Sequence, residues 1–298
     1  MTTQLMGEFM PRPPGVADTT VASSQSPGSV FTISEAAFQV LWEYLALPEM
    51  PEALYVSPYG MGEREREAWV SNAWTELQRG GMADSATPHP RLAALLENLA
   101  RPARAVDVRL WLGAPVRAFA GGTPERAAFA VLVDGYVNVH AISPGDLARA
   151  PVSLLLDAAP GAGRAVSLPM DVIADTRWSV RHREGLAHTD DAMVRARSAG
   201  SAEATWLAEM IYGAVDRGYF QAYAVDHRGY QHRAERPVGF FDSPNGRYMI
   251  EESQAHDGRE WIYVGPASAR MVVERVERSL LILGQRARLA ERSANTVD

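Results

Sequence analysis

An alternation of apolar and other side chains runs through Val106-Asp107-Val108-Arg109-Leu110-Trp111-Leu112. Successive side chains of a β-strand point to opposite faces of a sheet, so this period of two predicts a strand with one buried face. Three further extended segments follow, at 116–120, 128–133 and 136–142. The last two flank Asp134-Gly135, the strongest short signal for a two-residue hairpin. Four extended segments in a row predict antiparallel pairing.

The same order of segments recurs after residue 200. A helical pattern at 202–216 leads into extended segments at 219–225, 230–235, 238–241, 247–252 and 260–264, and then into a closing helix over about 267–290. Asp257-Gly258 takes the place of Asp134-Gly135, and Pro266 takes the place of Pro144. An old duplication and a coincidence of two hairpin-rich segments both explain this correspondence. We expect an α+β fold with a central, mostly antiparallel β-sheet, flanking helices and two halves related by a pseudo-twofold axis.

Helical patterns precede the strands of the first half. Thr32 and Glu35 have the spacing of a capping box, and apolar residues at helical intervals continue behind them, which predicts a helix that ends near Leu47. The other elements expected in this half are a short strand at 53–56 and helices at 63–78, 91–100 and 146–156.

The chain divides into an arm, a domain and a connector within that domain. Residues 1–29 are rich in proline, glycine and serine, so we expect a flexible arm. A single domain is expected over 30–290, with half-repeats at about 30–160 and 200–290 and a connector at 160–200. Residues 1–29 lack the apolar run of a signal peptide, and no segment has the roughly 18 consecutive apolar residues of a membrane-spanning helix. We therefore expect a cytoplasmic protein that does not insert into membranes.

The composition excludes several chemistries. The 298 residues include no cysteine and no lysine, which excludes thiolate nucleophiles, cysteine-ligated metal centres and Schiff bases. A formal net charge of −7 has the wrong sign for a protein that binds nucleic acid through phosphates. Neither a Gly-x-Ser-x-Gly elbow nor a His-Glu-x-x-His motif occurs. His188-Thr189-Asp190-Asp191 is better explained by a solvated loop than by a metal site, so no catalytic residue, cofactor or metal is expected.

The second face of the first strand mixes aromatic residues with arginine, and the second half repeats this mixture. Tryptophan, tyrosine and arginine carry most of the binding energy of protein interfaces, which favours a partner-binding face. A sheet face that the protein's own helices cover explains the pattern equally well. If the face binds a partner, we expect the contacts at Arg109, Trp111, Arg117, Phe119, Gly121, Gly122, Thr123, Glu125, Tyr223 and Arg233.

The hairpin at Ser243-Pro244-Asn245-Gly246 has an acid on one side and a base on the other. We expect Asp242 and Arg247 to stabilise this hairpin rather than to catalyse, because Asn245-Gly246 can supply the positive φ that a tight turn needs.

The most specific motifs lie near the C-terminus and are Arg236-Pro237-Val238-Gly239-Phe240-Phe241-Asp242-Ser243-Pro244-Asn245-Gly246-Arg247-Tyr248, Asp257-Gly258-Arg259-Glu260-Trp261 and Gly265-Pro266-Ala267. Earlier segments that agree with them in order are Phe31-Thr32-Ile33, Trp74-Thr75-Glu76-Leu77, Arg109-Leu110-Trp111-Leu112 and Ser167-Leu168-Pro169. On these residues the chain resembles the EspG family, the ESX (type VII) secretion-associated proteins of mycobacteria and related actinobacteria, over about residues 30–285.

The resemblance implies a cytosolic chaperone rather than an enzyme. It implies that the protein binds the PPE subunit of a PE–PPE heterodimer at its helical tip, keeps the heterodimer soluble and delivers it to an ESX secretion system. The free protein is then expected to be a monomer or a weak dimer. A small hydrolase or a metal-dependent enzyme with a polar cleft is the alternative. The family has no short binding motif that transfers residue by residue, so the expected contacts rest on the alternation.

Overall fold

The computed structural model describes residues 30–56, 62–85, 87–170 and 200–294. The arm expected at 1–29 and the charged part of the connector, at 182–191, lie outside the described residues.

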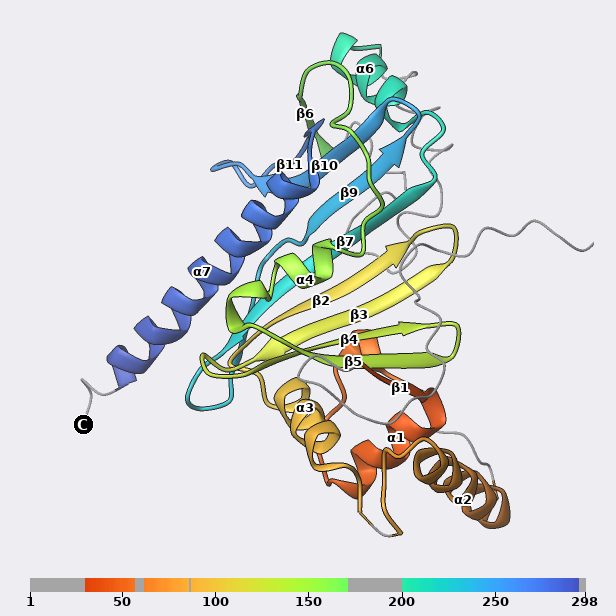
Figure 1. Ribbon diagram of the computed structural model, residues 1–298. Coiled ribbons are helices and arrows are strands. Elements are labelled where there is room, and N and C mark those ends of the chain that lie inside the picture. The colour runs from red at the N-terminus through yellow and green to blue at the C-terminus, as the bar shows by residue number, and fades with distance from the viewer. Residues whose placement is uncertain (1–29, 57–61, 86, 171–199, 295–298) are drawn as a thin grey trace, which may run out of the picture.

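A large β-sheet forms the centre of the molecule (Figure 1). All pairs of its strands are antiparallel, so the predicted α+β class with an antiparallel sheet is confirmed. The strands are β1 (Phe31–Ser34), β2 (Arg104–Trp111), β3 (Pro115–Gly122), β4 (Ala127–Val133), β5 (Tyr136–Ile142), β6 (Val166–Pro169), β7 (Asp216–Val225), β8 (Gln231–Arg233), β9 (Val238–Ser243), β10 (Gly246–Gln254) and β11 (Glu260–Pro266).

The two halves of the chain meet at the pair formed by β2 and β7, which runs from Arg104 opposite Ala224 to Trp111 opposite Arg217. Outward from this pair, the first half adds β3, β4, β5 and β1, and the second half adds β9, β10, β11 and β6. In each half the outermost strand precedes the others in the chain. The short strand β8 pairs with β7 beside this path.

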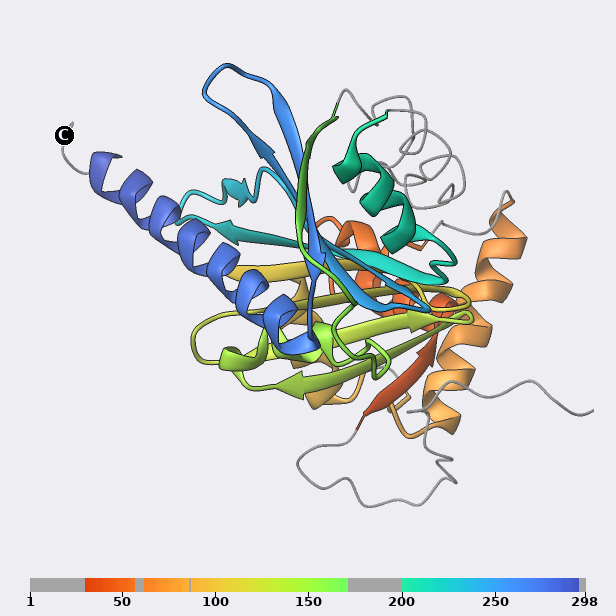
Figure 2. The same ribbon diagram turned by 90° about the horizontal axis from the view of Figure 1, so that it is seen from above.

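Helices cover both faces of the sheet. Their bounds are α1 (Glu35–Tyr44), α2 (Glu63–Arg79), α3 (Pro90–Ala100), α4 (Arg149–Val152), α6 (Ala202–Ile211) and α7 (Ala269–Ala294), with 3₁₀ turns η1 (Glu52–Leu54) and η2 (Pro144–Asp146). Helices α7 and α4 pack on one face, where Phe240 belongs to the shared core. Helix α6 packs on the other face against the next residue, Phe241, and Figure 2 shows α6 and α7 on opposite sides of these strands.

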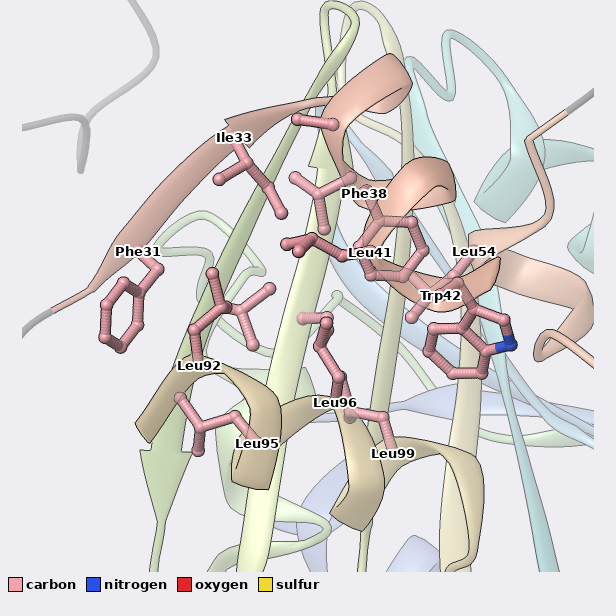
Figure 3. Packing of buried hydrophobic residues seen from close by; sticks show 14 of the residues in the cluster. Phe31, Ile33, Phe38, Leu41, Trp42, Leu54, Leu92, Leu95, Leu96 and Leu99 are labelled. Atoms are coloured by element: carbon pink, nitrogen blue, oxygen red, sulfur yellow. The ribbon is translucent and has the colours of Figure 1, made fainter. Parts of the chain in front are cut away.

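The alternation of β2 places its apolar residues as predicted. Val106, Val108 and Leu110 are buried in the core beneath α7. On the opposite face, α1, α3 and β1 enclose a second core, which Figure 3 shows. Leucines of α3 enter this core at spacings of three and four residues, which place them on one side of a helix. These residues are Leu92, Leu95, Leu96 and Leu99.

Three predicted elements are wrong in detail, each for a local reason. Ser34 rather than Thr32 caps α1, because its Oγ accepts a hydrogen bond from the Ala37 amide (3.1 Å). The strand expected at 53–56 is replaced by η1 and an extended end, since the Ala53 amide bonds to a side chain rather than to a strand. The helix expected at 146–156 is reduced to η2 and α4, because Pro151 has no amide hydrogen to donate.

Positive φ angles allow two of the predicted turns. Asp134 (φ 50°) and Gly135 (φ 79°) form the hairpin between β4 and β5. Gly246 (φ 108°) supplies the positive φ between β9 and β10, whereas Asn245 has no positive φ. Helix α6 ends at Ile211, earlier than predicted, just before Gly213 (φ 70°).

Arg247 and Asp242 form a buried ion pair across the β9–β10 hairpin. Arg247 is 1% exposed and donates from Nε to Asp242 Oδ1 (2.7 Å) and from Nη2 to Oδ2 (2.6 Å). Its Nη2 also donates to the Leu156 carbonyl (2.6 Å). The pair therefore ties the hairpin to the end of the first half, in agreement with the structural role predicted for both residues.

Candidate partner-binding site

A cavity of about 1230 Å³ opens on the face of the sheet opposite α7. Strands β2, β3 and β7 form its floor. Its walls come from the segment before and within η1, from the end of α3, and from the hairpin that joins β7 to β8. Because β2 and β7 pair, the two halves of the chain both contribute to this cavity.

Five of the ten predicted site residues line the cavity. They are Arg109, Arg117, Thr123, Tyr223 and Arg233. Each lies on the face of the sheet opposite the apolar residues of β2, or in a loop beside that face. The alternation pattern therefore pointed to a hollow part of the surface.

The side of the cavity formed by the first half is occupied by the protein's own chain. Arg109 donates from Nη2 to the Glu52 carbonyl (3.0 Å), and Arg117 donates from Nη1 to the Tyr55 carbonyl (2.9 Å). Between these two carbonyls, the Ala53 amide donates to Asp107 Oδ2 (3.0 Å). Three side chains from β2 and β3 thus hold the main chain of η1, and the interpretation that the protein covers its own sheet face is correct on this side.

Asp107 is the acidic residue among the three side chains that hold η1. Burial raises the pKa of Asp107, while the nearby Arg109 and the Ala53 amide act in the opposite direction. A perturbed carboxyl in a polar cleft is what the enzyme alternative would require. One oxygen of this carboxyl already accepts the Ala53 amide, so its observed role is to position η1. Across the described ranges, no group of three or more His, Asp or Glu side chains is placed to hold a metal ion.

On the other side of the cavity, Asp226 organises the turn between β7 and β8. Its Oδ1 accepts hydrogen bonds from the amides of Arg228 and Tyr230 (2.9 Å each), and its Oδ2 lies 3.1 Å from His232 Nε2. Burial raises the pKa of Asp226, but the hydrogen bonds outweigh it and hold that pKa below its ordinary value. Gly229 (φ 83°) supplies the positive φ of this turn, and His232 lies on the short strand β8.

Tyr223 and Arg233 lie opposite each other on β7 and β8 and face the same cavity. Tyr223 is 8% exposed, and its ring lies 5.8 Å from the ring of Phe119. Burial raises the pKa of Tyr223, so its hydroxyl stays a hydrogen-bond donor at neutral pH. Within the described part of the chain, neither this hydroxyl nor the Arg233 guanidinium has a hydrogen bond or an ion pair.

Three of the predicted contact residues are buried, which is a correction. Phe119 is 0% exposed, because its ring fills the core beneath α3. Gly121 and Gly122 are also buried, and a Cβ on Gly122 would lie 2.2 Å from the Arg126 carbonyl oxygen. None of the three can touch a partner in this conformation.

Trp111 and the β3–β4 loop lie outside the most enclosed part of this face. Trp111 is 43% exposed and does not line the cavity; the Arg217 guanidinium lies 5.5 Å from the centre of its ring. The loop closes on itself, since Thr123 Oγ1 donates to Glu125 Oε2 (2.8 Å) and accepts from the Arg126 amide (3.3 Å). Glu125 is exposed and does not line the cavity.

Two walls of the cavity carry no residue that was predicted from the sequence. The segment at 48–52 carries no periodic pattern, and its position depends on side chains more than 50 residues away, so no local signal marks it. Arg101 and its neighbours at the end of α3 also line the cavity. Their signal was Pro102, which ends a helix directly before a strand whose second face is polar.

No helix in the described ranges combines the length and the hydropathy that crossing a bilayer requires.

Comparisons with known proteins agree with this architecture. A curated relative, the ESX-3 secretion-associated protein EspG3 of Mycolicibacterium smegmatis, is 25% identical over 261 residues, which are 85% of this chain and 86% of the relative. A solved structure with the same fold is that of the Mycobacterium tuberculosis type VII secretion system chaperone EspG5 in complex with the PE25–PPE41 dimer. Its TM-score is 0.62 at 17% identity, over 85% of this chain and 96% of that chain. The family model described as the EspG family matches residues 34–278, which is most of the sequence, and the chain therefore belongs to the EspG family.

Proposed function

We propose that this protein is a cytosolic chaperone that binds the PPE subunit of a PE–PPE heterodimer and keeps it soluble for a type VII secretion system. The observation that carries the proposal is membership in the EspG family over residues 34–278. The EspG5 structure, which shares the fold, is described as a chaperone in complex with a PE–PPE dimer. Chaperone function also fits a protein without the motifs of a nucleophile elbow or a zinc protease.

Such a chaperone can keep its client soluble simply by covering an exposed apolar surface of the client. Large exposed apolar patches drive self-association, and a partner that binds only the folded, unassembled form shifts the equilibrium away from aggregates. No bond has to be made or broken, so a binding face is enough.

We place the client on the open part of the polar sheet face. Trp111 lies at one end of this part, and Tyr223 and Arg233 lie at the other. Tryptophan offers a large rigid contact area, and arginine can donate to carboxylates and carbonyls at the tip of a helical pair. Arg109 and Arg117 contribute indirectly, since they fix the η1 wall against which the client would rest.

Residues 30–290 form one domain in this proposal. The pairing of β2 with β7 makes the sheet continuous across both halves, which supports a single cooperative unit. A client bound across β2 and β7 would contact both half-repeats at once.

Co-expression tests the proposal. The full chain is produced with PE–PPE pairs from its source genome, and each mixture is scored by co-purification and by the mass of the complex. We expect one pair or a few pairs to co-purify as a defined complex with one copy of this chain. If no pair does so while the chain itself is folded, the chaperone proposal is rejected.

A pair of variants then tests the place of binding. Trp111→Ala removes an exposed ring on the proposed face, and Tyr136→Ala removes an exposed ring at the end of β5, on a different part of the surface. We expect the first change to cost about 2 kcal/mol or more in affinity, as for a central anchor, and the second to cost little. Equal affinities for both variants would exclude Trp111 from the interface.

A further inference from the structure

We propose that the end of the cavity between Arg101 and Arg233 is a subsite for the carboxylate of an acidic side chain of the client. This inference rests on the proposed chaperone function and specifies the chemistry by which the client is recognised.

The charged groups of the cavity fall into two sets. Arg109 and Arg117 are engaged, since Arg109 Nη2 lies 3.3 Å from Glu52 Oε1 and Arg117 Nη2 lies 3.6 Å from Glu35 Oε1, in addition to their bonds to main-chain carbonyls. Arg101 and Arg233 also line the cavity, but the guanidinium of neither forms an ion pair or a hydrogen bond among the described residues. The cavity thus has two guanidinium groups whose donors are available to a ligand.

Tyr223 adds a third available donor at the same end. Directly opposed residues on antiparallel strands have Cβ atoms about 5 Å apart, and Tyr223 and Arg233 are such a pair. Tyr223 is 8% exposed, and its hydroxyl, which faces the cavity, has no acceptor within the described residues. A ligand that supplies an acceptor there can gain a hydrogen bond in a partly desolvated site.

Arg101 lines the same cavity, and the connection between α3 and β2 that follows it is attached to β7. The Val225 amide donates to the Ala103 carbonyl (2.9 Å), two residues after Arg101. Arg101 and Arg233 therefore approach the cavity from different walls, one from each half of the chain. A ligand group between them would contact both halves.

The acids near this end do not neutralise the two arginines by direct pairing. Asp226 is engaged by the amides of its own turn and by His232. Asp107 accepts the Ala53 amide, its approach to Arg109 is at 4.0 Å, and it attracts Arg233 electrostatically without forming an ion pair with it. Glu49 is exposed on the opposite wall and forms no ion pair with either arginine. The guanidinium donors of Arg101 and Arg233 therefore remain available to an acidic ligand.

The backbone that carries Arg233 is fixed before any ligand arrives. Gln221 donates from Nε2 to the Ala234 carbonyl (2.9 Å), and the Ala234 amide donates to the Ala222 carbonyl (3.0 Å). The fixed backbone sets the wall from which Arg233 extends, and the planar fork of a guanidinium matches a carboxylate with two parallel hydrogen bonds. A carboxylate therefore suits this subsite better than a neutral carbonyl does.

The test measures the affinity of the full chain for the PE–PPE pair that co-purifies with it. We expect Arg233→Gln to weaken binding at least tenfold and Arg101→Gln to weaken it several-fold, and we expect both losses to shrink as salt is raised. Tyr223→Phe keeps the ring and should weaken binding a few-fold. The matched control is Arg149→Gln, since Arg149 is an exposed arginine on α4, on the opposite face of the sheet. It should bind as wild type does.

Charge exchange identifies the ligand group. In the background of Arg233→Glu, each Asp and Glu at the tip of the client is changed in turn to Arg, and one such change should restore much of the lost affinity. If Arg233→Gln binds as wild type does, the subsite is overturned while the chaperone proposal stands. If Arg233→Gln weakens binding but no acidic residue of the client couples to it, the ligand is not a carboxylate and the proposal is also overturned. If the wild-type chain binds no PE–PPE pair, the chaperone function itself has failed.

Discussion

Phe119 and Trp111 lie on the same face of the sheet, yet the structure predicts opposite consequences when each is changed to alanine. Phe119 is wholly enclosed and Trp111 is almost half exposed. Their side chains follow the same alternation, so sequence pattern alone does not distinguish them. We therefore expect Phe119→Ala to impair mainly folding and Trp111→Ala to impair mainly binding of the client.

The loss for Phe119→Ala is large because the ring fills a closed space. Truncation of a buried phenylalanine costs about 3–5 kcal/mol from lost transfer energy and from the cavity that remains. The contact with the Tyr223 ring, at 5.8 Å between centroids, is lost as well. Since whole domains are stable by only about 5–15 kcal/mol, this change removes a large part of the unfolding free energy. Phe119→Leu keeps most of the volume and should cost much less.

The loss for Trp111→Ala is small because solvent already reaches the ring. The contact with Arg217, at 5.5 Å, contributes about 0.5–1 kcal/mol at such an exposed site. We expect the unfolding free energy to change by about 1 kcal/mol and the affinity for the client to fall by about 2 kcal/mol or more. Denaturant unfolding and titration with the PE–PPE pair, on the same preparations, give both numbers. If Trp111→Ala destabilised the fold as much as Phe119→Ala does, the assignment of the two residues would be refuted.

The remaining predictions concern the fold and its pH dependence. Arg247→Met leaves Asp242 buried without its partner and should lower the unfolding free energy, measured in denaturant, by about 3–5 kcal/mol. An unchanged midpoint would contradict the stabilising role of this ion pair. Gly246→Ala should lower the melting temperature, because φ is 108° and a Cβ would lie 2.8 Å from the Ala159 carbonyl oxygen, whereas Asn245→Ala should change it little. The pKa of Asp107 is raised in the folded state, so its contribution to stability is present below the ordinary value of 3.8 and is lost as pH rises through the folded pKa. Asp107→Asn keeps an acceptor for the Ala53 amide but cannot titrate, so its unfolding free energy should not show this decline as the pH rises from below 3.8. If the variant and the wild type had the same pH profile, the role assigned to Asp107 would be contradicted.

The strands of the sheet were predictable because their signals are local. The period of two in β2 and the positive φ of Asp134-Gly135 need no distant contact to act, and both are found where they were predicted. The order of segments in the two halves was predictable for the same reason. The relation of the halves through β2 and β7 was not visible, since strand pairing across more than 100 residues leaves no periodic signal.

From the sequence, only the face of the sheet on which the candidate site lies was predictable. Alternation assigns a side chain to one side of a strand, but it does not say how far along the strand the covering helices extend. Helix α3 covers Phe119 and leaves Trp111 exposed, and η1 engages Arg109 while Arg233 stays open. These differences are set by tertiary contacts between segments far apart in the chain.

Hydrogen exchange of the full chain, free and bound to its PE–PPE pair, tests the central claim most directly. We expect slower exchange on binding in the β7–β8 hairpin, at 226–233, and at the turn that follows Trp111. We expect little change in α4 and in the half of α7 that packs on the opposite face. Protection confined to α4 and α7, with unchanged exchange in the hairpin, would contradict a client bound on the polar face of the sheet.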